Sequence, residues 1–174
     1  ETSLICANPA IANHKAHKDT YSVEYGISSC YNILPVGGGS YTLSRIVLTR
    51  LVELADSTEH FLNYLLPEAL ESLAEYMNER IRFLVEESGF FESSFLAKEG
   101  LISRENFVAM YGITGLAEAV NALLKDSGMK YGNDEEANQL GEQIMEIIEE
   151  FVADYPAIYS EMANDRFMTH AQVG

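Results

Sequence analysis

A single cysteine, Cys30, lies seven residues before a run of three glycines, Gly37–Gly39, in a chain that has only two cysteines. Between Tyr21 and Pro35 the one charged residue is Glu24, and no Lys, Arg or His adjoins the thiol. A thiolate nucleophile needs a nearby cation or a helix N-terminus, so the local sequence does not favour thiolate chemistry. Two interpretations stay open: a small buried side chain, the commonest fate of a free cysteine, and a neutral thiol that loses a hydrogen atom in an uncharged, dry loop.

The glycine triplet precedes a helix-like sequence, and helix N-termini bind phosphate groups. The Walker pattern ends in Gly-Lys-Ser/Thr, and no Lys is near the triplet. The dinucleotide pattern requires a third glycine where this sequence has Thr42. We therefore expect Gly37, Gly38 and Gly39 to form a structural loop, in which they permit a tight turn and close approach of the backbone.

A basic segment, His14-Lys15-Ala16-His17-Lys18, stands out in a chain whose formal net charge is -16. One interpretation is that His14, Lys15, His17 and Lys18 hold an anionic group of a substrate. The alternative, a solvated basic turn, is the commoner role of such a cluster. Histidines three residues apart without carboxylate support make a weak metal site, so no metal is expected. Cys6 is either buried or a second catalytic thiol.

The composition limits the function classes. The chain has 174 residues, enough for one domain, with 27 acidic residues against 11 Lys and Arg. This acidic surface disfavours nucleic acid and anionic membranes as partners. No apolar run is long enough to span a membrane, no signal peptide pattern is present, and two cysteines do not make a disulfide framework, so a cytoplasmic location is expected. The start at Glu1 rather than Met favours a piece of a longer protein.

The hydrophobic pattern predicts a mainly α fold with a short β segment. A strand within residues 21–35 has no obvious partner in the chain. We divide the domain into a strand and cysteine-loop portion (residues 1–41) and a helical portion (42–174). The expected helices cover residues 42–55, 61–88 with a break near Pro67, 103–110, a segment from 114 onward, and 134–155.

Three segments carry a resemblance to a known family. The sequence SSCYNILPVGGGSYTLSRIVLTRL, from Ser28, resembles the cysteine loop of glycyl radical enzymes, and most of all that of anaerobic ribonucleoside-triphosphate reductase. MYGITGLAEAVNALL and GNDEEANQLGEQIMEII resemble later segments of that reductase, in the same order. The resemblance covers about residues 25–151. It is nearest to a family of predicted glycine radical proteins related to the reductase.

The resemblance implies a fragment of a ten-stranded α/β barrel, with Cys30 at the tip of a loop inside it. It also implies anaerobic radical chemistry, of oxidoreductase or lyase type. An activating enzyme that uses S-adenosylmethionine and an iron–sulfur cluster makes a radical on a glycine near the C-terminus. That radical takes the hydrogen atom of Cys30, and the thiyl radical attacks a small substrate; the basic segment leaves open that this substrate is anionic. The partners expected are this activase and the substrate, and a homodimer is left open.

Two family features are missing from this sequence. No Arg-Val-x-Gly-Tyr/Phe segment for the radical glycine is present, and neither is the reductase's four-cysteine zinc site. We therefore expect the piece to be inactive alone, and ribonucleotide reduction is not carried over. The rival hypothesis is an acidic, helical protein-interaction module with no catalytic activity.

Overall fold

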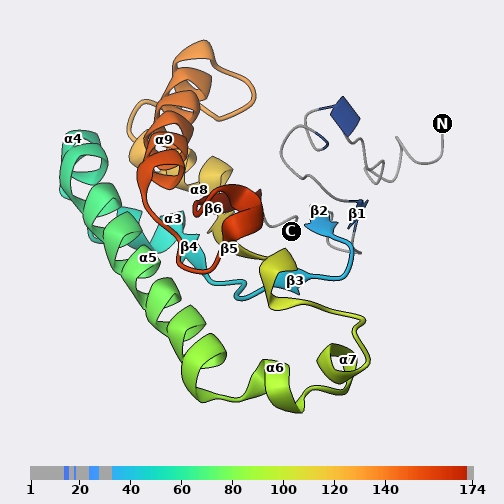
Figure 1. Cartoon of the computed structure of the whole chain (residues 1–174). Helices are drawn as coiled ribbons and strands as arrows, with labels where there is room; N and C mark the ends of the chain where they lie inside the picture. Colours follow the sequence, from blue (N-terminus) through green and yellow to red (C-terminus); the bar gives the residue numbers. More distant parts are fainter. Residues whose placement is uncertain (1–13, 16–17, 19–23, 28–32, 172–174) are drawn as a thin grey trace.

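A small parallel β-sheet lies at the centre of the molecule (Figure 1). The structure is a computed structural model of the chain, and it describes residues 14–15, 18, 24–27 and 33–171. Strand β5 (Phe107–Thr114) is the central strand. Strands β3 (Gly39–Ser40) and β4 (Arg45–Val47) pair with its first and last residues, and β6 (Phe167–Ala171) also pairs with it, all in parallel. The sheet is therefore built around β5.

Helices connect the parallel strands, as parallel pairing requires. Between β4 and β5 the chain forms α3 (Leu48–Val52), α4 (Thr58–His60), the π-helical turn η1 (Phe61–Leu65), α5 (Leu66–Arg82), a second π-helical turn η2 (Phe83–Glu87), α6 (Phe90–Ser93), α7 (Phe95–Lys98) and the 3-10 turn η3 (Arg104–Asn106). Between β5 and β6 it forms α8 (Leu116–Leu123), α9 (Glu135–Asp154) and the 3-10 turn η4 (Glu161–Ala163). None of the helices in these described ranges is both long and apolar enough to cross a bilayer.

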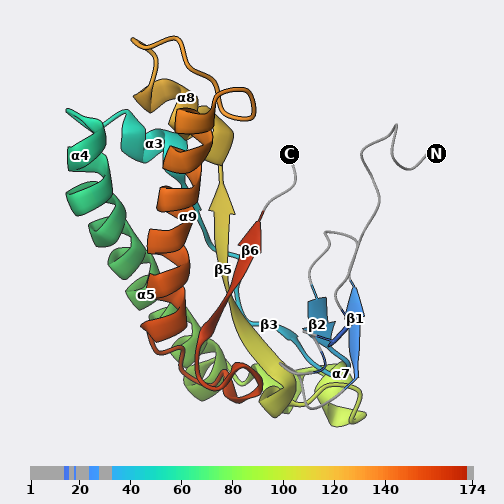
Figure 2. The ribbon, with the colours of Figure 1, turned by 90° about the horizontal axis from the view of Figure 1, so that it is seen from above.

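One face of the sheet is covered by α5 and α9 (Figure 2). Ala109, Tyr111 and Ile113 of β5 point into this core, together with Ile46 and Phe167 from the neighbouring strands. The helices contribute a stripe of buried side chains at helical spacing: Leu66, Leu70, Ala74, Met77 and Ile81 from α5, and Ala137, Leu140, Ile144, Ile148 and Val152 from α9. Burial of this stripe is the main force that holds the helices on the sheet.

The opposite face, which we call the hairpin face, bears Val108 and Met110 of β5. A β-hairpin of β1 (Tyr25–Ile27) and β2 (Ile33–Pro35), paired antiparallel, lies on this side, away from α5 and α9 (Figures 1 and 2). Helices thus cover one face of the sheet, and the hairpin lies against the first half of β5 on the other.

The expected fold class, a mainly α fragment of a ten-stranded barrel, is wrong. The described residues form an open four-stranded sheet with helices on one face, and no closed barrel is present among them. The four strands of this sheet are fewer than half of the ten that the expected barrel requires.

Three of the expected elements are also wrong. The segment 42–55 is expected to be one helix, but strand β4 (Arg45–Val47) occupies its first part and helix α3 covers only Leu48–Val52. The segment 103–110 was expected to be helical, but strand β5 begins at Phe107. The short strand was expected to lack a partner, but β1 and β2 pair with each other. By contrast, the long helix expected over residues 134–155 is confirmed as α9.

Candidate active site

The glycine triplet places the hairpin against the start of β5. Gly37 has a φ of +76°, a left-handed conformation that glycine adopts without strain. The N–H of Ser103 donates to its carbonyl oxygen at 2.8 Å. A Cβ on Gly38 would lie 1.8 Å from the carbonyl oxygen of Asn106, so the backbones approach too closely for any side chain. Gly39 then begins β3 beside Phe107. No Lys or phosphate-loop pattern accompanies this turn.

Cys30 belongs to residues 28–32, which follow β1 and precede β2 in the sequence and lie outside the described residues. The strands on either side of it are described, and both contact the hairpin face. Tyr25, Ile33 and Leu34, together with Met162 and Met168, pack against an apolar patch made of the buried side chains of Val108, Met110 and Ala163. Both strands that flank the cysteine segment therefore contact uncharged side chains.

The basic segment is only partly described. The side chains of His14, Lys15 and Lys18 are exposed, whereas His17 and Cys6 lie outside the described residues. Nδ1 of His14 is hydrogen-bonded to the hydroxyl of Tyr25, and the two rings are 5.5 Å apart. Because Tyr25 is part of β1, His14 lies beside the hairpin. That this segment binds substrate stays a prediction. Within the described ranges, His, Cys, Asp and Glu form no group of three or more that could hold a metal ion.

Sequence reasoning missed a row of residues across the hairpin face. Arg45 of β4 pairs in register with Gly112 of β5, and Gly112 pairs with His170 of β6. Ile46 points into the helix-covered core, so Arg45 projects from the opposite face. His170 lies two residues after Met168 and shares its face by the same alternation. Only the register of three strands brings these residues together, and the strands β4 and β6 were not expected from the pattern.

His170 is 8% exposed, and two causes lower the pKa of its imidazole. Burial in the protein is the larger cause, and the positive charge of Arg45 is the second. A lowered pKa favours the neutral imidazole at neutral pH. The pair of Arg45 and His170 therefore carries one positive charge, located on Arg45.

Acidification should weaken the fold through His170. The unfolded chain protonates this group near pH 6.5, whereas the folded protein protonates it only at lower pH. Stability is therefore complete above about pH 6.5 and falls as the pH drops toward the folded pKa. We expect the thermal midpoint of the full-length His170→Gln variant to depend less on pH between about 7.5 and 5 than that of the wild type. His60→Gln is the matched control, because His60 lies on a helical segment without buried residues; equal slopes in wild type and His170→Gln would contradict the assignment.

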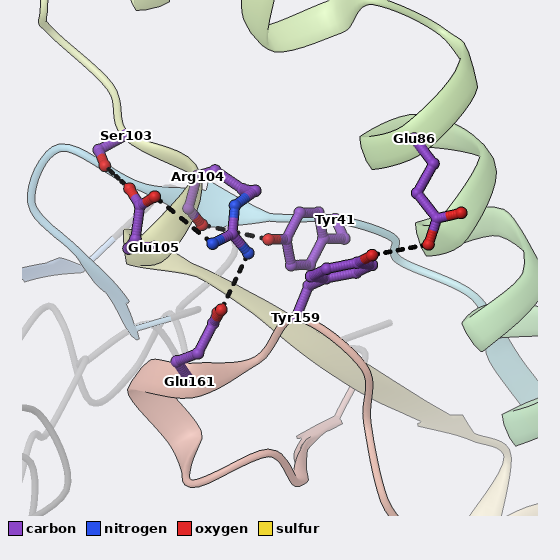
Figure 3. Close-up of polar contacts among 7 residues, drawn as sticks. All are labelled: Tyr41, Glu86, Ser103, Arg104, Glu105, Tyr159 and Glu161. Carbon is purple, nitrogen blue, oxygen red and sulfur yellow. Dashed lines mark hydrogen bonds and ion pairs between the residues drawn. The ribbon is translucent and has the colours of Figure 1, made fainter.

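A second polar cluster lies at the other end of the sheet (Figure 3). The guanidinium of Arg104 donates to Glu161 at 2.9 Å and lies 5.3 Å from the ring centre of Tyr159. The hydroxyl of Tyr41 donates to the carbonyl oxygen of Arg104 at 3.1 Å, and burial raises its pKa. The hydroxyl of Tyr159 donates to Glu86 at 2.6 Å. Since each of these groups already has a partner, the cluster ties η2, η3 and η4 together and is structural.

The family model described as glycyl radical enzyme YjjI-like matches residues 1–174, the whole chain. An uncharacterized protein of Haemophilus influenzae is 39% identical over 173 residues, which are 98% of this chain and 34% of that protein. The uncharacterized protein YjjI of Escherichia coli is 42% identical over 172 residues, 97% of this chain and 33% of that protein. The chain thus spans about a third of the length of these relatives. It belongs to the YjjI-like family of glycyl radical enzymes.

Proposed function

We propose that the full-length protein abstracts a hydrogen atom from a small substrate by means of a thiyl radical on Cys30. A glycyl radical, located outside these 174 residues, takes the hydrogen atom of the Cys30 thiol. The glycine Cα–H bond forms as the S–H bond breaks. The thiyl radical then takes a hydrogen atom from a substrate carbon, which restores S–H and leaves a carbon radical. This chain's part is to hold the thiol in position and to keep competing reactants away.

The observation that carries the proposal is the packing of both strands beside Cys30 on the apolar patch of the hairpin face. A thiyl radical is neutral and reacts with any accessible hydrogen donor or oxidant. Its host site should therefore be uncharged and closed to bulk solvent, and the loop that bears it should be fixed. The pairing of β1 with β2 and the glycine turn at Gly37–Gly38 hold in place the two strands that flank this segment. Family membership supports the same chemistry.

The proposal also requires a partner that generates the glycyl radical. In glycyl radical enzymes this is an activase that uses S-adenosylmethionine and an iron–sulfur cluster. We propose that such an activase acts on the full-length protein, at the glycine and not at this chain's own residues. The site of activase docking is therefore not assigned to this chain.

Deuterium exchange tests the role of Cys30 without a known substrate. The full-length protein, activated without oxygen, should show a doublet in electron paramagnetic resonance from the one α-hydrogen of the glycyl radical. Thiol hydrogens exchange with solvent, so in D₂O the Cys30 thiol becomes S–D. Reversible transfer between the thiol and the glycine then replaces the α-hydrogen by deuterium, and the doublet should collapse toward a singlet.

The Cys30→Ala variant should form the radical but keep its doublet in D₂O. Cys6→Ala is the matched control and should lose the doublet as the wild type does. Collapse at the wild-type rate in Cys30→Ala would show that another group transfers the hydrogen, and the proposed role of Cys30 would then be wrong. Absence of any radical under effective activation would refute the function itself.

A further inference from the structure

The hairpin face carries a polar position next to its apolar patch. Met110 belongs to the patch, and Gly112 follows two residues later on the same face of β5, roughly 7 Å further along the strand. At this level Arg45 and His170 flank Gly112 from the two neighbouring strands. A small molecule beside Met168, which is only half-buried and packs against the patch, can therefore lie within reach of both side chains.

Because Gly112 has no side chain, none lies between Arg45 and His170, the residues that pair with it on the neighbouring strands. A Cβ at this position would lie 2.6 Å from the Cβ of Arg45 and 2.8 Å from the carbonyl oxygen of Ser44. The N–H of Gly112 donates to that same carbonyl at 2.9 Å, which fixes the strand that carries Arg45. The absence of a side chain at Gly112 thus leaves room for the Cβ of Arg45 beside β5.

We propose that Arg45 and His170 bind a carboxylate group of the substrate on the hairpin face. The inference deepens the proposed function and rests on it, because it assumes that the hairpin face is where hydrogen abstraction occurs. It gives the substrate a chemical class: a small carboxylic acid whose anion is held beside the apolar patch.

The charge of the pair favours a carboxylate over a phosphate monoester. A guanidinium presents five N–H donors in a planar fork, so it can bind a carboxylate in a bidentate manner alongside its other interactions. Burial lowers the pKa of His170, so the imidazole stays neutral and can contribute one N–H donor without a second positive charge. One positive charge matches a monoanion. Because the chain as a whole carries a formal charge of -16, an anion needs such a local cation to approach.

Binding of propanoate to the unactivated full-length protein tests this site. Saturation-transfer difference NMR should detect saturable binding to the wild type, since propanoate joins a carboxylate to a short apolar chain. Arg45→Gln should weaken that binding at least tenfold, roughly the loss expected for a charge-assisted bidentate contact. Arg50→Gln is the matched control and should bind as the wild type does, because Arg50 is exposed and pairs with Glu53 at 2.9 Å.

A second variant keeps the test independent of Arg45. His170→Phe retains a ring of similar size but lacks the N–H donor, and it should weaken propanoate binding about fivefold. Thermal midpoints close to that of the wild type would show that both variants are folded. The inference is overturned if the wild type binds no propanoate, or if both variants bind propanoate as the wild type does. It is also overturned if inorganic phosphate binds the site more tightly than propanoate and displaces it at a concentration below that of the propanoate.

This experiment separates the two proposals, because it requires neither the radical nor the activase. Cys30→Ala should bind propanoate with wild-type affinity. If propanoate binds normally but the glycyl doublet still collapses in D₂O in Cys30→Ala, only the radical role of Cys30 is refuted. If the collapse depends on Cys30 but the protein binds no propanoate, only the carboxylate site is refuted.

Discussion

Gly38→Ala should lower the stability of the full-length protein by about 3 kcal/mol, the upper end of the usual cost of overpacking, and displace the hairpin from the sheet. The added Cβ would lie 1.8 Å from the carbonyl oxygen and 2.5 Å from the carbonyl carbon of Asn106. Both are backbone atoms at the start of β5, so no side-chain rotation relieves the overlap. Either β3 separates from β5 or the turn moves away with β2.

Two measurements check this expectation. The thermal midpoint should fall strongly, and the collapse of the glycyl doublet in D₂O should become slower because the strands beside Cys30 have moved. Gly26→Ala is the control from the same hairpin, since a Cβ there meets nothing within 4 Å. It should be neutral or slightly stabilising. If the two alanine variants melt together, the close approach at Gly38 is not a constraint.

Tyr111→Ala should cost about 3–5 kcal/mol, as expected for the loss of a fully buried aromatic side chain. Tyr111 lies on the helix-covered face of β5, with no exposed surface, in edge contacts with Phe151 of α9 and Phe167 of β6. Its hydroxyl donates to the carbonyl oxygen of Leu70 in α5 at 3.0 Å. One side chain therefore joins the sheet to both long helices.

A conservative replacement of Tyr111 separates the contribution of its ring from that of its hydrogen bond, and a replacement at an exposed tyrosine serves as the control. Tyr111→Phe keeps the ring and removes only the hydroxyl, so it should cost about 1 kcal/mol. Tyr64→Ala, at a position 67% exposed, should change the unfolding free energy by less than about 0.5 kcal/mol. Denaturant midpoints of the full-length variants measure all three effects. Similar losses for Tyr111→Ala and Tyr64→Ala would contradict the central role of this tyrosine.

The sequence pattern predicted an element that has one apolar and one polar side, and it missed an element that is buried on both sides. Helix α9 has an apolar stripe and an acidic face, so its period was plain. Strand β5 is buried from Phe107 to Ile113 and shows no alternation, which is typical of a strand covered on both faces. A buried strand of this kind is hard to distinguish from a buried helix by periodicity alone.

The candidate site was predicted only in part for a related reason. Cys30 and the glycine triplet are neighbours in sequence, so their spacing could be analysed directly. Arg45 and His170 are 125 positions apart in the chain and meet only through β5. Such pairing depends on strand register, which no local pattern specifies.

The order of the strands along the chain has a consequence for biosynthesis. The hairpin ends at Pro35, whereas the central strand begins at Phe107 and the last strand at Phe167. At translation rates of about 5–20 residues per second, the ribosome needs on the order of ten seconds to add what lies between the hairpin and β6. During the first part of that interval, before Val108 and Met110 are made, β1 and β2 lack the buried side chains on which they later pack. A ribosome stalled before Phe107 would therefore hold a nascent hairpin with apolar side chains uncovered, a natural target for chaperones.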